Sequence, residues 1–154
     1  MLRGVRQESD AKRSRSRGLV VFSVGGRRLA ARAEEVGGVS YWPETMPVPS
    51  KTPFVKAVAR REKEVMPVFD LAQKLNVQVQ GATPLSLVVK HEDGPMVIRI
   101  DEEIPVLHMV EPSAVQPYSG SDPDIVATFA DGAERIPIYS LAKLGKVDAA
   151  RSPA

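Results

Sequence analysis

The sequence predicts an all-β protein made of about ten short strands, and three observations support this. Short apolar runs recur with turn residues between them about every eight to twelve residues. Gly25-Gly26, Asp93-Gly94 and Asp131-Gly132 each separate two such runs, and these dipeptides favour two-residue hairpin turns because they tolerate positive φ. The chain of 154 residues also contains 13 prolines and 11 glycines, which suits strands and turns better than long helices. We therefore expect a β-barrel or sandwich architecture.

In the first half, residues 33–36 predict a single helical turn and residues 43–53 a loop or edge segment, because their four prolines lack the N–H that a β-ladder needs. Asp70 is the predicted N-cap of a short helix in which Leu71 and Leu75 are spaced i, i+4. The strands expected around these features span residues 19–24, 27–32, 39–42, 54–59 and 64–69.

In the second half, we expect a polar connector at residues 76–84, a loop-rich segment at residues 112–123 and a final helical turn at residues 139–144. The expected strands span residues 85–90, 95–100, 104–110, 125–129 and 135–138.

Charge divides the chain into a basic arm and a nearly neutral body. The net charge is +2, but residues 1–17 alone carry +4, so residues 18–154 carry −2. We expect residues 1–17 to be a disordered basic arm, residues 18–145 to form the folded domain, and residues 146–154 to be a frayed tail. Two β-subdomains are expected within residues 18–145, split near residues 76–84, with strand exchange between them possible.

Composition excludes several classes of protein. No cysteine is present, which excludes disulfides, thiolate metal sites and cysteine nucleophiles. The apolar runs are too short to span a bilayer, and no apolar stretch of a secretory signal precedes Leu19. We therefore expect a cytoplasmic protein.

Residues with catalytic chemistry are scarce. His91 and His108 lie in different expected strands without carboxylates at ligand spacing, so we expect no metal site. The run Asp101-Glu102-Glu103 follows a strand, where neighbouring side chains point to opposite faces, so we interpret it as a solvated strand end. We expect a non-enzyme with no catalytic residues and no cofactor.

Residues 47–75 carry the most informative pattern: a proline-containing loop, then Phe54-Val55, a charged turn, and Pro67-Val68-Phe69-Asp70-Leu71. This block resembles the CheW-like domain of chemotaxis coupling proteins. The opening hairpin, the strand Val97–Asp101 and the closing segment Ile136–Leu141 are also similar to that family, so the resemblance covers roughly residues 18–145. The matching positions of the central block are Pro53, Phe54, Val55, Val58, Val65, Pro67, Val68, Asp70 and Leu71.

The resemblance implies a fold and two partners. The family fold is two five-stranded, SH3-like β-barrel subdomains. Family members are adaptors that bind the cytoplasmic tip of chemoreceptors (methyl-accepting chemotaxis proteins) and a CheA-type histidine kinase. The receptor tip is a helical coiled coil, which would dock in an apolar groove.

This sequence departs from the family at two charged positions. The family has an Asn-x-Arg-Gly turn where this chain has Arg60-Arg61-Glu62-Lys63, so Glu62 stands at the arginine position and Lys63 at the glycine position. The family's glutamate in the preceding segment is replaced by Gly38. Because both members of an oppositely charged pair are absent, we expect one partnership to be lost or altered, although neutral drift at an exposed turn is the alternative.

Candidate interface residues follow from the resemblance. For the receptor groove we predict Val36, Val39, Val97 and Ile98, with a purely core role as the alternative. For the kinase or array contact we predict Glu62, Lys63 and Glu64. Tyr41 and Trp42 are either exposed anchors or core residues.

Three other functions remain open. The basic arm favours a nucleic-acid-associated β-barrel protein as the main alternative, with salt-sensitive binding through residues 1–17. A small enzyme of another type and a structural assembly protein are further possibilities, because a fold does not determine a function.

Overall fold

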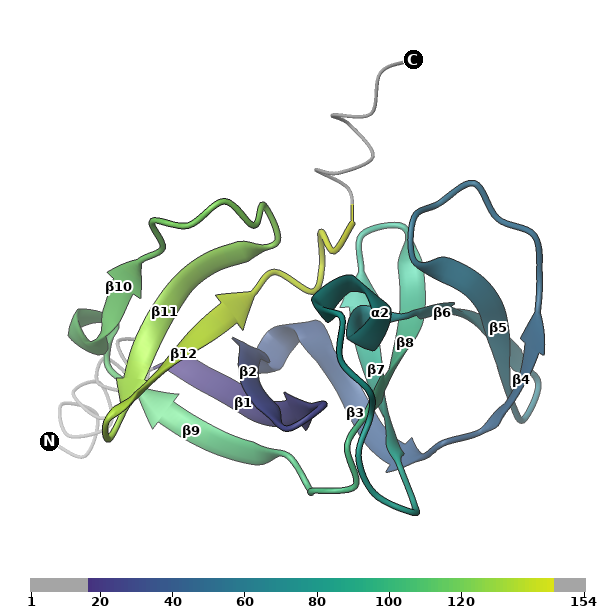
Figure 1. Ribbon diagram of the computed structural model, residues 1–154, viewed down its shortest axis with the longest axis horizontal. Helices are drawn as coiled ribbons and strands as arrows, with labels where there is room; N and C mark the ends of the chain where they lie inside the picture. Colours follow the sequence, from purple (N-terminus) through teal and green to yellow (C-terminus); the bar gives the residue numbers. More distant parts are fainter. Residues whose placement is uncertain (1–16, 146–154) are drawn as a thin grey trace, which may run out of the picture.

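The computed structural model describes residues 17–145, so the predicted arm, apart from Arg17, and the tail 146–154 lie outside the described residues. The described chain forms two curled sheets that lie side by side as two lobes (Figure 1). The first lobe contains β1 (Arg17–Val24), β2 (Arg27–Arg32), β9 (Val106–Val110), β10 (Val115–Pro117), β11 (Ile125–Asp131) and β12 (Glu134–Tyr139). The second contains β3 (Val36–Tyr41), β4 (Glu44–Pro47), β5 (Val55–Arg61), β6 (Glu64–Phe69), β7 (Leu85–His91) and β8 (Gly94–Ile100).

The two sheets share one topology. Their strand orders are β10-β11-β12-β2-β1-β9 and β4-β5-β6-β8-β7-β3, and a short parallel pairing joins the hairpins in each: β12 with β2, and β6 with β8. The chain passes between the lobes at η1 (Ala33–Glu35) and again after β8. Residues 76–84 connect α2 (Leu71–Leu75) to β7 within the second lobe.

The all-β prediction is confirmed, but each sheet has six strands rather than five. The two additional strands are β4 and β10, which are short edge strands inside the proline-containing segments. Each ends on a proline, Pro47 or Pro117, which an edge strand tolerates because one side of its backbone needs no partner. The prediction that residues 43–53 include an edge segment is thereby confirmed, and the loop-rich segment 112–123 contains the short strand β10.

The hairpin turns are close to their predicted positions. Gly25 and Gly26 form the β1–β2 turn with φ of 62° and 81°, as expected. The other two loops are displaced by one residue. His91 pairs with Gly94 and Asp131 with Glu134, so the loops are residues 92–93 and 132–133. Glycine adopts positive φ either within the loop or beside it, so the sequence alone does not determine where in the turn the glycine lies.

The predicted final helical turn at residues 139–144 is wrong in extent. Tyr139 ends β12, and only one hydrogen-bonded turn follows, from the Leu144 N–H to the Leu141 carbonyl. The Glu35 carboxylate accepts from the N–H groups of Leu141 and Ala142, and Gly145 then takes a φ of 79°, which ends the turn. By contrast, Asp70 is confirmed as a cap, because its carboxylate accepts from the Gln73 N–H at 3.0 Å.

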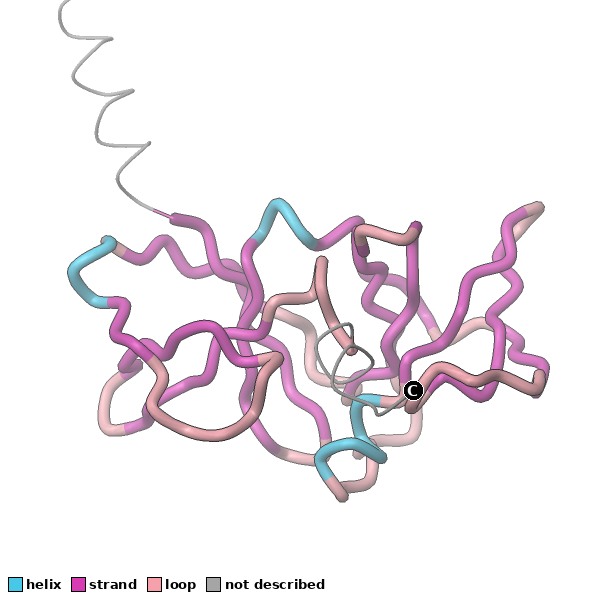
Figure 2. The backbone as a smooth tube through the Cα atoms, turned by 90° about the horizontal axis from the view of Figure 1, so that it is seen from above, coloured by secondary structure: helices cyan, strands magenta, loops and turns pink. Residues whose placement is uncertain are grey.

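One large core lies between the lobes, and each sheet encloses a smaller core on its other face. Alternation along β1 shows the division: Leu19 and Val21 join the small core of the first lobe, whereas Phe22 and Val24 join the shared core. From the second lobe, β7 contributes Leu85, Leu87 and Val89 to the shared core. In Figure 2, η1 and α2 lie on opposite sides of the junction between the lobes.

Candidate protein-interaction surface

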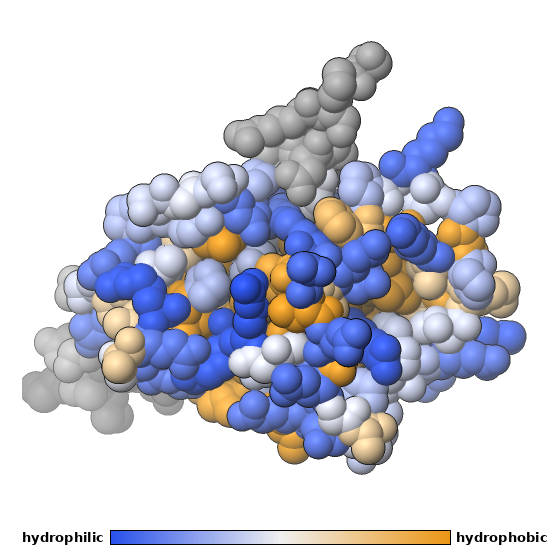
Figure 3. Space-filling model, viewed as in Figure 1, coloured by the Kyte–Doolittle hydropathy of each residue, from blue (hydrophilic) through white to orange (hydrophobic). Residues whose placement is uncertain are grey.

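Exposed apolar side chains gather at β9 and the residue pair before it. Four of the nine large apolar residues that are exposed within residues 17–145 lie between positions 104 and 109. Their exposed fractions are 75% for Ile104, 55% for Val106, 60% for Leu107 and 61% for Met109. Figure 3 shows apolar side chains emerging at the lower margin of the first lobe, where β9 runs in Figure 1. Because β9 is an edge strand, this margin is open to a partner.

The outer face of β9 continues onto β1 and η1. Leu107 pairs with Val20, and Met109 pairs with Gly18, so these side chains share a face. A Cβ on Gly18 would lie 3.3 Å from Ala33 Cβ, 3.4 Å from Leu107 Cδ1 and 3.6 Å from Met109 Sδ. Because Gly18 has no side chain, η1 and β9 can approach each other closely over β1.

The second lobe supplies the other half of this surface through a β-bulge. Val36 pairs with Val89 and Val39 with Leu87, with Gly37 and Gly38 accommodated between them. The bulge places Val36 and Val39 on one face despite their odd spacing. That face is the one that Leu87 and Val89 turn toward the shared core, and Tyr41, paired with Leu85, extends it outward.

We call the combined set the interlobe surface. It borders the shared core from both lobes, since Val20 lies on the same face of β1 as Phe22 and Val24. Val39 is 42% exposed and Tyr41 80% exposed, while Val36 packs partly against the shared core. Its members are Gly18, Val20, Ala33, Val36, Val39, Tyr41, Leu107 and Met109.

Of the four residues predicted for the receptor groove, the structure brings only Val36 and Val39 to a surface. Val97 and Ile98 are 1% and 0% exposed, so they take the core role that the sequence left open. Ile98 lies in the shared core and Val97 in the small core of the second lobe. A run of apolar residues does not distinguish a strand that is buried on both faces from a strand with one exposed apolar face. The sequence alone therefore could not show that Val97 and Ile98 are buried.

Sequence reasoning missed Val20, Leu107 and Met109. The available signal was the apolar run Val106-Leu107-His108-Met109-Val110, in which both alternating faces are apolar. His108 does not belong to the surface, because its ring lies 6.1 Å from the Phe129 ring on the inner side of the sheet. A strand at a sheet edge with apolar residues on both faces indicates an uncovered outer face.

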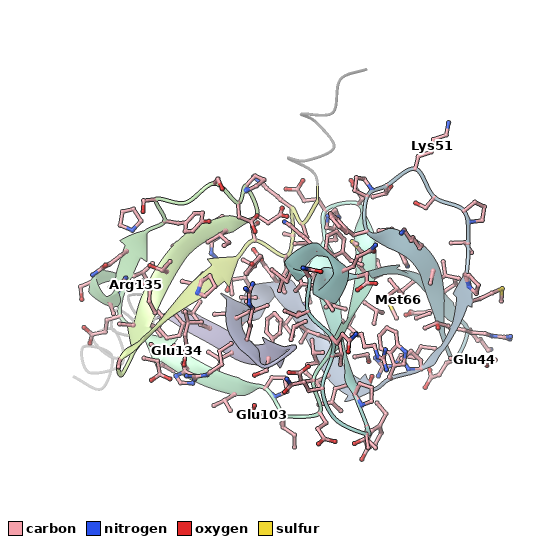
Figure 4. The ribbon with its side chains drawn as sticks, viewed as in Figure 1. Glu44, Lys51, Met66, Glu103, Glu134 and Arg135 are labelled. Carbon is pink, nitrogen blue, oxygen red and sulfur yellow. The ribbon has the colours of Figure 1, made fainter. Side chains whose placement is uncertain are left out.

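The three residues predicted for the kinase contact lie together at the tip of the β5–β6 hairpin. Arg61 pairs with Glu64, so Glu62 and Lys63 form the two-residue loop, and all of them are exposed. They border a shallow hollow of about 490 Å³ whose other walls include Gly37, Met66, Val88 and Pro95. Figure 4 locates Met66 within the second lobe. The altered turn and the glycine bulge of β3 therefore face one hollow.

The two departures from the family also have backbone consequences. Glu62 has a φ of 53°, so the positive φ of this turn falls on Glu62 and not on Lys63. Gly38 has a φ of 149°, and a Cβ there would meet nothing within 4 Å. Space is therefore available for a side chain at position 38, but the backbone conformation favours glycine.

Trp42 and Tyr41 have different environments. Tyr41 is an exposed side chain of the interlobe surface, whereas Trp42 packs partly against the small core of the second lobe. The Arg99 guanidinium carbon lies 5.8 Å from the centre of the Trp42 ring, a cation–π distance.

Buried carboxylates tie the two lobes together. Asp101 is 4% exposed and accepts from the N–H groups of Gly25, Gly26 and Gln80 at 2.8–2.9 Å. The expectation of a solvated strand end is therefore wrong at Asp101, whose carboxylate has exchanged water for three backbone donors. Glu102 and Glu103 are exposed, as expected.

A second tie joins α2 to the segment before β11. The Lys74 ammonium contacts both Asp122 and Asp124, and Asp124 is 1% exposed. Burial lowers the pKa of Lys74, but hydrogen bonding and charge interaction with the two carboxylates outweigh it and leave the pKa raised. The ammonium therefore stays charged at the junction.

The described residues contain no cluster of histidine and acidic side chains that could hold a metal ion. His91 Nε2 lies 2.9 Å from the Leu144 carbonyl oxygen, so that ring contributes to the packing of the closing turn. No helix within residues 17–145 is long and apolar enough to cross a membrane.

Comparison with protein families decides the relationship. The CheW-like domain family model matches residues 18–148. This chain belongs to the CheW-like domain family. Like other members, it is a scaffold or adaptor domain and not an enzyme.

A solved structure supports the CheW-like fold independently. The chain matches the crystal structure of the scaffolding protein TtCheW from Thermoanaerobacter tengcongensis with a TM-score of 0.71. The alignment covers 84% of this chain and 92% of that one at 15% sequence identity, so the likeness concerns the fold. No curated protein matches the sequence significantly.

Proposed function

We propose that this CheW-like protein is a cytoplasmic adaptor of a bacterial chemosensory array that binds the cytoplasmic tip of a chemoreceptor through the interlobe surface. The single observation that carries this proposal is the position of the exposed apolar residues. Leu107, Met109 and Val20 on one lobe and Val39 on the other border the same junction. Apolar side chains on both sides of this junction suit an amphipathic helix, which would bury its apolar stripe against them.

The small residues of the surface support a helical partner. Gly18 and Ala33 add little side-chain bulk next to Leu107 and Met109, which would let a helix approach closely there. Long, unbranched methionine adapts to different partner surfaces, and a central apolar anchor is where binding energy concentrates. Glu35 accepts from the Leu141 N–H and Asp101 from the Gly25 N–H, and these bonds join distant segments of the chain at the junction of the lobes.

The partnership with a CheA-type kinase is the one we propose to be lost or altered. Glu62, Lys63 and Glu64 would form this contact at the hollow that also includes Gly37. Two facts support an altered contact: the loop carries Glu62 where the family carries arginine, and Gly38 stands where the family carries glutamate. A partner adapted to the family's charges would meet a different charge here.

Binding measured separately for each partner tests this proposal. A soluble receptor hairpin fragment and a kinase regulatory domain from the same genome would each be titrated with the full chain by calorimetry. We expect the receptor fragment to bind. We expect the affinity of this chain for the kinase domain to be lower than the affinity of a CheW protein that keeps the charged pair for its own kinase. Normal affinity for both partners would exclude an altered partnership, and no binding to the receptor fragment would exclude the adaptor role proposed here.

A matched pair of variants locates the receptor contact. Leu107→Glu places a charge in the centre of the interlobe surface, whereas Val126→Glu places one on β11, where Val126 is 43% exposed. We expect Leu107→Glu to weaken receptor binding by about tenfold or more, since it buries an unpaired charge. Val126→Glu should bind like the wild type, and equal loss in both variants would mean that the surface is assigned wrongly.

A further inference from the structure

Strand β9 differs from the other three sheet edges within residues 17–145. The two sheets end on β3, β4, β9 and β10. Pro47 ends β4, Pro117 ends β10, and a bulge at Gly37 and Gly38 interrupts β3; each of these features hinders pairing with a further strand. The five residues of β9, Val106–Val110, contain no proline, glycine, lysine, arginine or acidic residue. An edge strand of this composition is a template for another strand.

The side chains of β9 are uncovered on both faces. Val106 is more than half exposed although it pairs with Val21, which belongs to the small core of the first lobe. Leu107 and Met109, on the opposite face, are also more than half exposed. In Figure 1, β9 runs along the lower margin of the first lobe with no described strand beyond it. Because every second residue of an edge strand directs its N–H and C=O away from the sheet, this margin offers backbone donors and acceptors together with apolar side chains.

The order of residues in β9 makes the strand complementary to a second copy of itself. In an antiparallel pair with His108 opposite His108 of the second copy, Leu107 lies opposite Met109 and Val106 lies opposite Val110. All five residues of the strand then have a partner, and no acidic residue, lysine or proline enters the ladder. Apolar cross-strand pairs of this kind stabilise antiparallel strands.

The two neighbouring registers are less favourable. A pair centred on Leu107 would place Glu103 opposite Glu111 of the second copy, and like charges directly opposite each other are destabilising. A pair centred on Met109 would place Leu107 opposite Glu111 and bring Pro112, which has no N–H to donate, into the ladder. The charged and proline residues that flank β9 therefore select the register in which the strand pairs with itself completely.

We propose that two copies of this chain associate through β9 in an antiparallel pair centred on His108. The twofold axis of such a pair is perpendicular to the sheet, so both copies present Leu107 and Met109 on the same side. The contact uses the edge of β9, whereas the proposed function uses its outer face, so this inference does not depend on that function. Since each copy contributes only five residues, the interface is small, and we expect a dissociation constant in the micromolar range.

Sedimentation velocity of the full chain from roughly 0.01 to 0.5 mM tests the dimer, and we expect a concentration-dependent shift from monomer to dimer. Leu107→Lys and Met109→Glu should each weaken dimerisation by about tenfold or more, because each places a charge opposite an apolar side chain twice in the dimer. The two substitutions combined in one chain place lysine opposite glutamate at both contacts, and dimerisation should return to within about threefold of the wild type. Val65→Lys, at a position on β6 that is 62% exposed, is the control and should dimerise like the wild type.

Three outcomes of this experiment would overturn the proposal. A wild-type chain that stays monomeric throughout the range forms no such dimer. A dimer that the β9 substitutions leave unchanged uses another surface, and a combined variant as weak as the single variants excludes the register.

Amide hydrogen exchange of residues 106–110 distinguishes the other possible occupants of this edge. We expect exchange to slow as the concentration of the chain rises. Slow exchange at every concentration would mean that the edge is covered within one chain. Exchange that slows only when the receptor hairpin fragment is added would mean that the edge serves another protein, and either of these results refutes the dimer.

Discussion

The Asp101 carboxylate joins three chain segments, and replacing Asp101 with asparagine is expected to destabilise the protein by about 3 kcal/mol. Its Oδ1 atom accepts from Gly25 N–H at 2.9 Å and from Gln80 N–H at 2.8 Å, and its Oδ2 atom accepts from Gly26 N–H at 2.8 Å. The three donors belong to the β1–β2 turn of the first lobe and to the connector before β7 of the second.

The magnitude follows from what asparagine can keep. Its single oxygen can retain the Gly25 and Gln80 bonds, but its NH2 group faces the Gly26 N–H, so one charge-assisted bond worth about 1.5–3 kcal/mol is lost. The two remaining bonds become neutral and lose roughly half their strength. In a domain of this size about 3 kcal/mol corresponds to a Tm lower by ~10 °C.

Urea unfolding followed by circular dichroism measures this change, with Glu44→Gln as the control. Glu44 is exposed on β4, so its substitution removes the same charge and should change stability by less than about 0.5 kcal/mol. A loss below about 1 kcal/mol for Asp101→Asn would refute the role of Asp101 in joining the lobes.

Three further substitutions test other parts of the structure. Lys74→Met removes the cation beside the buried Asp124, and urea unfolding should show a loss of about 3 kcal/mol; an unchanged midpoint would contradict the interlobe ion cluster. In the wild type, the hydrogen bond from the Arg28 guanidinium lowers the pKa of Asp131 below its ordinary value of 3.8. This pair therefore stabilises the fold above pH 3.8, and the stabilisation is lost as the pH falls through the lowered pKa. In Arg28→Gln, carboxyl NMR titration should show the pKa of Asp131 rising toward 3.8. An identical titration in the variant would disprove that cause. Gly38→Glu restores the family carboxylate without a clash but at φ 149°, so thermal unfolding should show a loss of about 1–2 kcal/mol, and a gain would mean that the bulge relaxes.

The strands could be predicted because their signals are local. Hairpin dipeptides, alternation and the Asp70 cap depend on residues that are neighbours in sequence, and the positions of β2 and β6 match the predicted ranges fully. The short strands β4 and β10 could not be predicted from propensity, because proline and polar residues become strand only when a neighbouring edge pairs with them.

The interlobe surface was predicted only in part because exposure depends on which strands become edges. Val97 and Leu107 both lie in apolar runs, yet β8 has neighbours on both sides, whereas β9 is an edge strand. Burial of Asp101 likewise required a turn from the other end of the chain, 75 residues away in sequence at Gly26. The glycines at positions 37 and 38 indicated a departure from the family, but only the register shows that they align Val36 with Val39.

Amide hydrogen exchange with and without the receptor hairpin fragment tests the central claim most directly. The account predicts that the fragment slows exchange in residues 18–20, 33–41 and 104–110, the three segments that form the interlobe surface, while residues 55–69 exchange as before. Slowed exchange confined to the β5–β6 hairpin, or no change in any segment, would contradict the assignment of the receptor contact to the interlobe surface.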